Sequence, residues 1–261
     1  MSATARLLEQ RSIGQARLRV DAQGVRTLRE SGSAKIRALE GGSQAILINT
    51  SGGIAGGDRF DWRLEAGQGS CLYATSQAAE RVYRTLGPPA AVSVKLGIER
   101  NAALFWLPQE TILFDGASLT RSFEVTLEQG ARLLALEPIV FGRREMGETV
   151  GRLHLQDTWR IWRGSRLAHA ESLALGPELP ISNAALAGAG AMGTIVYFAD
   201  DAEGRLDAVR GALGPSSGAS AWNGKLIARL LAEDGFLLRK QIISVLAVLA
   251  GVGTLPKIWT M

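Results

Sequence analysis

The sequence predicts a mostly β protein whose helices are confined to its C-terminal part. Three observations predict this class: apolar and polar residues alternate through most segments before residue 175, a strand–turn–strand pattern recurs along that region, and helical spacing replaces the alternation after residue 220. We expect one domain over 1–261, with stacked or coiled β-strand hairpin units at about 1–212, two C-terminal α-helices at about 220–251 packed on them, and a tail at 252–261.

The alternation places apolar side chains at every second position, as half-buried strands require. It is clearest in three segments, at Phe60, Trp62 and Leu64, at Val92, Val94, Leu96 and Ile98, and at Phe123, Val125 and Leu127.

Four copies of a strand–turn–strand unit follow one another. They read "LEAGQGSCLYATS", "IERNAALFWLPQE", "LEQGARLLALEPI" and "IWRGSRLAHAESL", and they begin at residues 64, 98, 127 and 161. The fourth residue of each copy tolerates the left-handed backbone of a tight turn. This repetition favours a stacked or coiled β architecture, although four loose matches also fit generic hairpins. The turn residues are Gly67, Asn101, Gly130 and Gly164.

Two carboxylates fall into register if the copies stack. The eleventh position holds Ala74, Pro108, Glu137 and Glu171, so the third and fourth copies place acids in one column. Both glutamates lie in apolar stretches, where a buried carboxylate needs a partner, internal water or a cation. The alternative is that each lies at a strand end and points into solvent.

The C-terminal third shows helical spacing. Leu226, Ile227, Leu230 and Leu231 predict a helix that stops at Gly235, and residues 236–250 predict a second one. The closing "LPKIWTM" carries Trp259, which must either pack back on the body or meet a partner.

The stretch "NTSGGIAGGDRFD" has the outer glycine spacing of a phosphate-binding loop, but Asp58 and Arg59 replace the lysine and hydroxyl residue that such a loop needs. A carboxylate beside the amides disfavours phosphate. We therefore interpret the stretch as a tight connection between strands, in which glycines permit positive φ.

Composition excludes several classes of protein. With one cysteine, Cys71, and two histidines, the sequence indicates no internal disulfide, no zinc cluster and no nucleophilic catalytic triad. A net charge of +4 without a basic block disfavours nucleic-acid binding, and no apolar run is long enough for a membrane span or a secretory signal, so we expect a cytoplasmic protein. Paired carboxylates keep one enzyme hypothesis open, a hydrolase acting alone.

Five motifs in order resemble the UreD (UreH) family of urease accessory proteins: "NTSGGIAGGDRF", "TSQAAERVYRT", "WLPQETILFDGA", "FGRREMGE" and "LPKIW". The resemblance implies a stacked β fold and a protein that is not an enzyme. It also implies partners, namely UreF, UreG and the urease structural subunits, and nickel carried in transit without a tightly bound cofactor.

The resemblance further implies a water-filled passage for nickel, lined by acids that match Asp58, Glu137 and Glu171 here. Carboxylates and water hold nickel weakly enough to release it, as a passage requires. For partner contacts, Arg81, Tyr83 and Arg84 in "TSQAAERVYRT" are residue types typical of interface anchors, as is Trp259, although the same stretch also fits a short packed helix.

Overall fold

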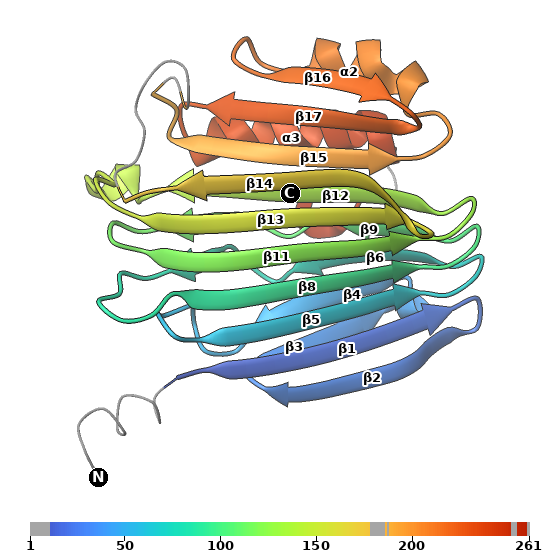
Figure 1. The fold of residues 1–261 in the computed structure, drawn as a ribbon, viewed down its shortest axis with the longest axis horizontal. Coiled ribbons are helices and arrows are strands. Elements are labelled where there is room, and N and C mark those ends of the chain that lie inside the picture. The colour runs from blue at the N-terminus through green and yellow to red at the C-terminus, as the bar shows by residue number, and fades with distance from the viewer. Residues whose placement is uncertain (1–10, 178–185, 187, 252–254, 260–261) are drawn as a thin grey trace.

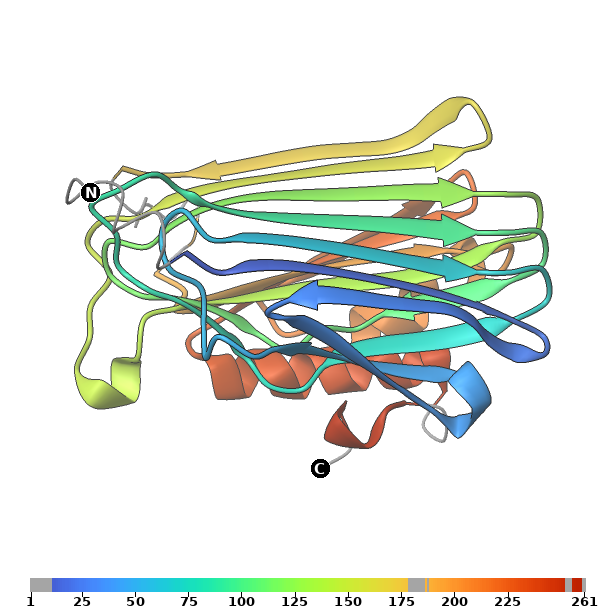
Figure 2. The same cartoon turned by 90° about the horizontal axis from the view of Figure 1, so that it is seen from below.

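The computed structural model describes residues 11–177, 186, 188–251 and 255–259. They form two stacked β-sheets, with helices on the outer face of one of them (Figures 1 and 2). From edge to edge, the seven-stranded sheet contains β14 (Arg166–Leu175), β13 (His154–Arg163), β11 (Ser118–Leu127), β8 (Ala90–Ile98), β5 (Arg59–Ala66), β1 (Ile13–Asp21) and β2 (Gly24–Gly32).

The second sheet has ten strands. Its main path contains β16 (Gly218–Trp222), β17 (Lys225–Ala232), β15 (Ala191–Phe198), β12 (Arg132–Phe141), β9 (Ala103–Trp106), β6 (Cys71–Ser76), β4 (Gln44–Asn49) and β3 (Ala34–Leu39). Off this path, β10 (Thr111–Leu113) pairs with β12 and with β7 (Glu80–Val82). The helical elements are α2 (Leu206–Ala212), α3 (Gly235–Ala250) and the short 3₁₀ turns η1 (Glu40–Gly42), η2 (Arg144–Met146), η3 (Glu203–Arg205) and η4 (Lys257–Trp259).

The chain winds between the two sheets as a coil. It passes from β5 to β6, from β8 to β9 and from β11 to β12, each time crossing from the seven-stranded to the ten-stranded sheet. Successive turns of the coil lie in parallel register, with Ala66 beside Ile98 and Ile98 beside Leu127. The prediction of a mostly β, stacked architecture with two C-terminal helices is therefore confirmed.

The predicted register is right for two copies and shifted by two residues for the first. Asn101 and Gly130 adopt positive φ values of 55° and 71°, as their turns require. In the first copy the positive φ belongs to Gly69, at 69°, two residues after the predicted Gly67. This offset matches the observed pairing of Ala66, not Leu64, with Ile98.

The fourth copy is a hairpin within one sheet, so the predicted column of acids is wrong. Gly164, with φ 56°, lies in a tight turn that returns β14 antiparallel to β13 in the seven-stranded sheet. Glu171 consequently lies opposite Trp159, whereas Glu137 lies in β12 of the other sheet.

The first of the two helices was predicted at the wrong place. Residues 221–232 form most of the β16–β17 hairpin, because Asn223 and Gly224 adopt the positive φ values, 53° and 67°, of a two-residue turn. The strand β17 carries leucine or isoleucine on both faces, so its spacing imitates a helix. The second predicted helix is α3, where the Asp234 carboxylate accepts a hydrogen bond from the Leu237 amide (2.8 Å).

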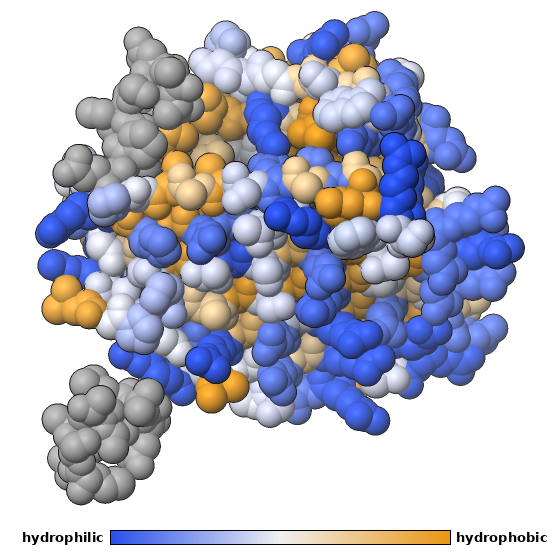
Figure 3. All heavy atoms as spheres, in the orientation of Figure 1, coloured by the Kyte–Doolittle hydropathy of each residue, from blue (hydrophilic) through white to orange (hydrophobic). Residues whose placement is uncertain are grey.

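Buried apolar side chains form two layers. One fills the space between the sheets, and the other lies between the ten-stranded sheet and α2 and α3. Strands of the seven-stranded sheet bury every second residue, as in β1 and β11, and expose the others. The face of the molecule in Figure 3 accordingly mixes many hydrophilic side chains with scattered hydrophobic ones.

Candidate functional site: a polar pocket between the sheets

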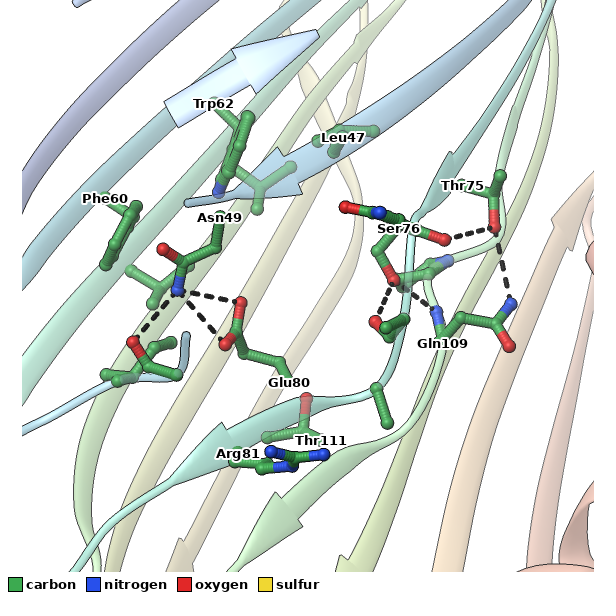
Figure 4. A pocket seen from close by; sticks show the side chains of 18 of the residues that line it. Leu47, Asn49, Phe60, Trp62, Thr75, Ser76, Glu80, Arg81, Gln109 and Thr111 are labelled. Atoms are coloured by element: carbon green, nitrogen blue, oxygen red, sulfur yellow. Dashed lines mark hydrogen bonds between the residues drawn. The ribbon is translucent and has the colours of Figure 1, made fainter. Parts of the chain in front are cut away.

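A cavity of about 250 Å³ lies between the two sheets, close to the glycine-rich segment that precedes β5. Its walls come from inward-facing residues of both sheets, and residues 76–81 form part of its rim. Figure 4 shows polar side chains pointing into this space from several strands. The side chains used in the argument below are Asn49, Glu80, Thr111, Arg121 and Glu137, and all of them line the cavity.

A buried ion cluster closes the inner side of the pocket. The Arg121 guanidinium of β11 donates to Glu137 of β12 (2.5 Å) and to Asp157 of β13 (2.6 Å), and all three side chains are at most 6% exposed. The Trp106 indole N–H donates to the second Glu137 oxygen (3.1 Å). Two buried atoms, Arg121 Nε and Asp157 Oδ1, have no hydrogen-bond partner among the described residues.

The cluster carries two carboxylates and one guanidinium. Burial raises the pKa of Glu137 to about 6, against the opposing attraction of Arg121. Burial also opposes the charge on Arg121, but the charges of Asp157 and Glu137 outweigh it and raise the pKa of the guanidinium. Arg121 therefore stays charged, and burial favours the protonated form of Glu137.

Glu80 lies on the rim side of the pocket with a neutral partner. The Asn49 side-chain amide donates to both Glu80 oxygens (3.1 and 3.2 Å) and to the Gly53 carbonyl (3.0 Å), as Figure 4 shows. Burial raises the pKa of Glu80 to about 7, and hydrogen bonds from Asn49 and the Arg81 backbone, together with the charge of Arg81, only partly offset this effect.

Asp58, a predicted nickel ligand, holds the glycine-rich segment together. Its carboxylate is 3% exposed and accepts hydrogen bonds from the backbone amides of Ser12 (2.8 Å) and Ala55 (2.8 Å). The side chain is not part of the pocket lining, although its charge contributes to the raised pKa of Glu80, after burial. Asp58 therefore affects the pKa of a pocket residue, Glu80, without lining the pocket itself.

The glycine-rich segment behaves as the sequence indicated. Gly52, Gly53 and Gly57 have φ values of 79°, 142° and 85°, and a Cβ on Gly56 would lie 2.0 Å from the Thr85 hydroxyl oxygen. Positive φ and close backbone approach therefore account for the glycines.

Glu171 lies at the far edge of the intersheet space. Arg229 of β17 donates to it (2.5 Å), and His169 Nε2 lies 3.4 Å from the same carboxylate oxygen. Burial opposes ionisation, but His169 and Arg229 lower the pKa of Glu171. Glu137 and Glu171 lie on different sheets, and each pairs with a different arginine.

A line of polar side chains nevertheless connects the two glutamates. Glu137 lies beside Thr194 across the β12–β15 pairing, and Arg229 donates both to the Thr194 hydroxyl (2.7 Å) and to Glu171. On the other side, Arg121 donates to the Thr111 hydroxyl (3.4 Å), and Thr111 lies beside Glu80 across the β10–β7 pairing. We call this line the polar track. Its members are Glu80, Thr111, Arg121, Glu137, Thr194, Arg229 and Glu171.

Comparison with known proteins supplies the family. The sequence family described as "UreD urease accessory protein" matches residues 12–260. The chain belongs to the UreD family of urease accessory proteins. Two relatives are named urease accessory protein UreD. The protein from Chelativorans sp. (strain BNC1) is 44% identical over 95% of this chain and 92% of the relative. The protein from Sinorhizobium medicae is 42% identical over the full length of both chains. A third, from Agrobacterium fabrum, is 41% identical over 97% of this chain and 93% of the relative.

The relatives' names point to a non-catalytic, accessory role. No helix within the described ranges is long and apolar enough to cross a membrane. Within the same ranges, no three His, Cys, Asp or Glu side chains gather into a group that could hold a metal ion. The three carboxylates of the polar track in this UreD chain instead accept hydrogen bonds from different side chains: Glu80 from Asn49, Glu137 from Arg121 and Glu171 from Arg229.

The predicted partner residues fall into two groups. "TSQAAERVYRT" is extended, not helical: Arg81 lies in β7 at the pocket lining, and Tyr83 donates to the Gly52 carbonyl (3.0 Å). Arg81 and Arg84 are exposed, and Tyr83 is half-buried.

Trp259 is fully buried, so the prediction that it contacts a partner directly is wrong. Its indole N–H donates to the Leu107 carbonyl (2.9 Å), and the Arg239 guanidinium lies 4.6 Å from the ring centroid. Arg239 also donates to Gln109, which lines the pocket (2.8 Å). The tail packs back on the body, which was the other alternative.

Sequence reasoning missed Arg121, Asp157 and Glu80. The first two carried a signal, because each occupies an inward position in an alternating strand: Arg121 precedes Phe123 by two residues, and Asp157 precedes Trp159 by two. A charge at an inward position predicts a buried ion pair. Glu80 carried no such signal, since β7 is only three residues long.

Proposed function

We propose that this UreD chain is a scaffold and nickel conduit in urease maturation. In this proposal it acts in a complex with UreF and UreG on the urease apoprotein and passes nickel through the intersheet pocket. The observation that carries the proposal is the pocket itself, which opens beside Glu80 and reaches the buried Glu137.

The chemistry of the polar track supports passage of a divalent ion. Its oxygen atoms belong to carboxylates and hydroxyls, which hold nickel less tightly than imidazole or thiolate, and its two cations, Arg121 and Arg229, are paired with Glu137 and Glu171. A passage requires binding that is favourable enough for entry and weak enough for release. The track also places one polar group after another from the rim side of the pocket to β14, through an otherwise apolar layer.

The surface around the pocket rim supports a role for partners. Arg81 is exposed and lines the pocket, Arg84 is exposed three residues further along the chain, and Tyr83 holds the glycine-rich segment against β7. We propose that this surface contacts a partner of the maturation complex, which would place the pocket opening at the interface. Nickel could then be handed over without release into bulk water.

Co-purification is the test. A tagged version of this chain, co-expressed with UreF, UreG and the urease subunits, is expected to retain all of them, and urease made without the chain is expected to contain little nickel. The nickel content of purified urease, determined by atomic absorption, checks the second expectation. Failure to retain the partners, together with full nickel loading in the absence of the chain, would refute the proposal.

A further inference from the structure

Two hairpin turns, one from each sheet, lie side by side at one end of the molecule (Figure 1). The first joins β13 to β14, and the second joins β16 to β17. Arg163, at the end of β13, donates to the carbonyls of Asn223 (3.2 Å) and Gly224 (2.8 Å) in the second turn. Lys225, at the start of β17, donates through Nζ to the Ala168 carbonyl (2.6 Å) of β14. Two cations therefore hold the turns together.

The cations at these turns have no acidic partner. Arg163, Arg166 and Lys225 form no ion pair within the described residues, and Lys225 is only 8% exposed. Burial lowers the pKa of Lys225, and the charges of Arg163 and Arg166 lower it further. On the same sheet, by contrast, Arg19 pairs with Glu65 (3.2 Å). The positive charge at the turns is therefore concentrated and uncompensated.

Two large apolar side chains are exposed beside these cations. Trp222 pairs with Lys225 in the β16–β17 hairpin and is 42% exposed, and the Lys225 ammonium lies 4.6 Å from its ring centroid. Leu167 follows Arg166 and is 41% exposed. Tryptophan and arginine are enriched among the residues that contribute most to binding at protein interfaces. We call this group the turn patch, and its members are Arg163, Arg166, Leu167, Trp222 and Lys225.

We propose that the turn patch is a docking surface for an acidic segment of a partner protein. Carboxylates of the segment would meet the three cations, and an apolar side chain would lie against Trp222 and Leu167. Arg163 and Lys225 are already held in place by carbonyl groups, so little side-chain freedom is lost when they bind. This inference rests on the proposed scaffold function, to which it adds a contact surface outside the intersheet pocket.

A protein segment fits the turn patch better than a continuous polyanion such as nucleic acid. Glu203 lies at the border of the patch, where its carboxylate accepts the Gly224 amide (2.8 Å), and the exposed Asp200 and Asp201 precede it in the chain. These acids would repel a row of phosphates, whereas the separate carboxylates of a protein can lie over the cations alone. A second copy of this chain is disfavoured, because two facing turn patches would bring like charges together.

The test compares variants of the full-length chain in matched pairs. Arg166→Glu reverses an exposed charge of the turn patch, and Leu167→Ala removes exposed apolar area. The controls are Arg29→Glu and Leu28→Ala, because both residues are exposed on β2, at the opposite edge of the seven-stranded sheet. Leu28 is 43% exposed, close to the 41% of Leu167.

The probe is a fluorescently labelled copolymer of glutamate and tyrosine, which presents carboxylates and apolar rings. Fluorescence anisotropy at low salt measures its binding to each purified variant. Retention of UreF, UreG and the urease subunits after co-expression is the second measurement. A single-stranded oligonucleotide serves as the competing polyanion.

We expect Arg166→Glu to weaken copolymer binding by about tenfold or more, Leu167→Ala to weaken it by a smaller factor, and neither control to change it. We also expect Arg166→Glu to retain less of one partner than the natural chain does at the same salt concentration.

Copolymer binding by Arg166→Glu equal to that of Arg29→Glu would overturn the inference, and so would full retention of every partner by Arg166→Glu. Oligonucleotide binding as tight as copolymer binding, and equally weakened in Arg166→Glu, would also overturn it, because the turn patch would then bind polyanions in general. In the first two cases the natural chain still retains its partners if the scaffold function is right. Loss of the partners by the natural chain itself would refute the scaffold function, while the copolymer measurement still decides whether the turn patch binds acidic segments.

Discussion

Arg121 and Glu137 form an ion pair across the interior of the protein, with the arginine on one sheet and the glutamate on the other. The pair is 5% exposed on both sides and shares its guanidinium with Asp157. A buried cluster of this kind gains little over apolar packing, because desolvation of the charges offsets their attraction. Its place beside a cavity is therefore better explained by function than by stability.

The first prediction concerns the balance of charges in this cluster. Arg121→Met leaves two buried carboxylates without a cation and is expected to lower the free energy of unfolding by about 3–5 kcal/mol. The triple variant Arg121→Met, Glu137→Gln, Asp157→Asn removes every charge and is expected to lose less. Urea unfolding of both proteins checks this order. A triple variant as unstable as Arg121→Met would show that unpaired buried charge does not cause the instability of Arg121→Met.

The second prediction is a pH dependence of stability caused by Glu80. Its pKa is raised in the folded protein to about 7 from the ordinary 4.5, so between these values the folded state binds the proton that the unfolded state has lost. Stability from this group is therefore complete below about pH 4.5 and falls as pH rises through about 7.

Glu80→Gln removes that fall. In metal-free buffer we expect the variant to be more stable than the natural protein at pH 8, by about 1–3 kcal/mol, and the difference to shrink towards pH 5. Urea unfolding at the two pH values measures it. A variant that loses stability equally at both pH values would indicate that the favourable contacts of Glu80 outweigh the cost of burying its charge.

The third prediction concerns the C-terminal tail. Trp259→Ala deletes a fully buried indole and is expected to cost about 3–5 kcal/mol, whereas Trp259→Phe keeps most of the packing and loses chiefly the hydrogen bond to the Leu107 carbonyl, about 1 kcal/mol. Thermal or urea unfolding distinguishes the two. Equal, small effects would mean that the tail does not pack on the body in solution.

The fourth prediction concerns the glycine-rich segment. Gly56→Ala would place a Cβ 2.0 Å from the Thr85 hydroxyl oxygen and 2.8 Å from the Pro88 carbonyl oxygen, and about 1–3 kcal/mol of destabilisation is expected from this overpacking. Gly204→Ala is the control, because a Cβ there meets nothing within 4 Å. If the two variants unfold at the same urea concentration, the close approach of Thr85 and Pro88 does not explain why residue 56 is a glycine.

The coiled β architecture could be predicted because the alternation and the turn residues agree with one another along the chain. Phe123, Val125 and Leu127 bury the face that the pattern assigns to them, and Asn101 and Gly130 turn where the repeat requires. The prediction failed where a local signal has two interpretations. Leu226 and Leu230 fit a helix by spacing, and only the preceding Asn223–Gly224 pair identified a hairpin.

The site was less predictable than the fold because it depends on contacts distant in sequence. The isolation of Glu137 among apolar residues correctly marked it as a buried acid, but its partner Arg121 lies on the opposite sheet. Glu171 was chosen by the same reasoning and Asp58 by the family resemblance, and Arg229 or backbone amides satisfy them. Glu80 stands out only in three dimensions, where the described residues give it hydrogen bonds from Asn49 and no ion pair.

The nickel content of urease matured with a blocked pocket tests the central claim most directly. Ala78→Trp and the control Ala208→Trp, an exposed alanine of α2 outside the pocket, would each be co-expressed with UreF, UreG and the urease subunits. With equal recovery of the assembled complex, the conduit account predicts urease with little nickel for Ala78→Trp and normal nickel for Ala208→Trp. Normal nickel with both variants would contradict passage through the intersheet pocket.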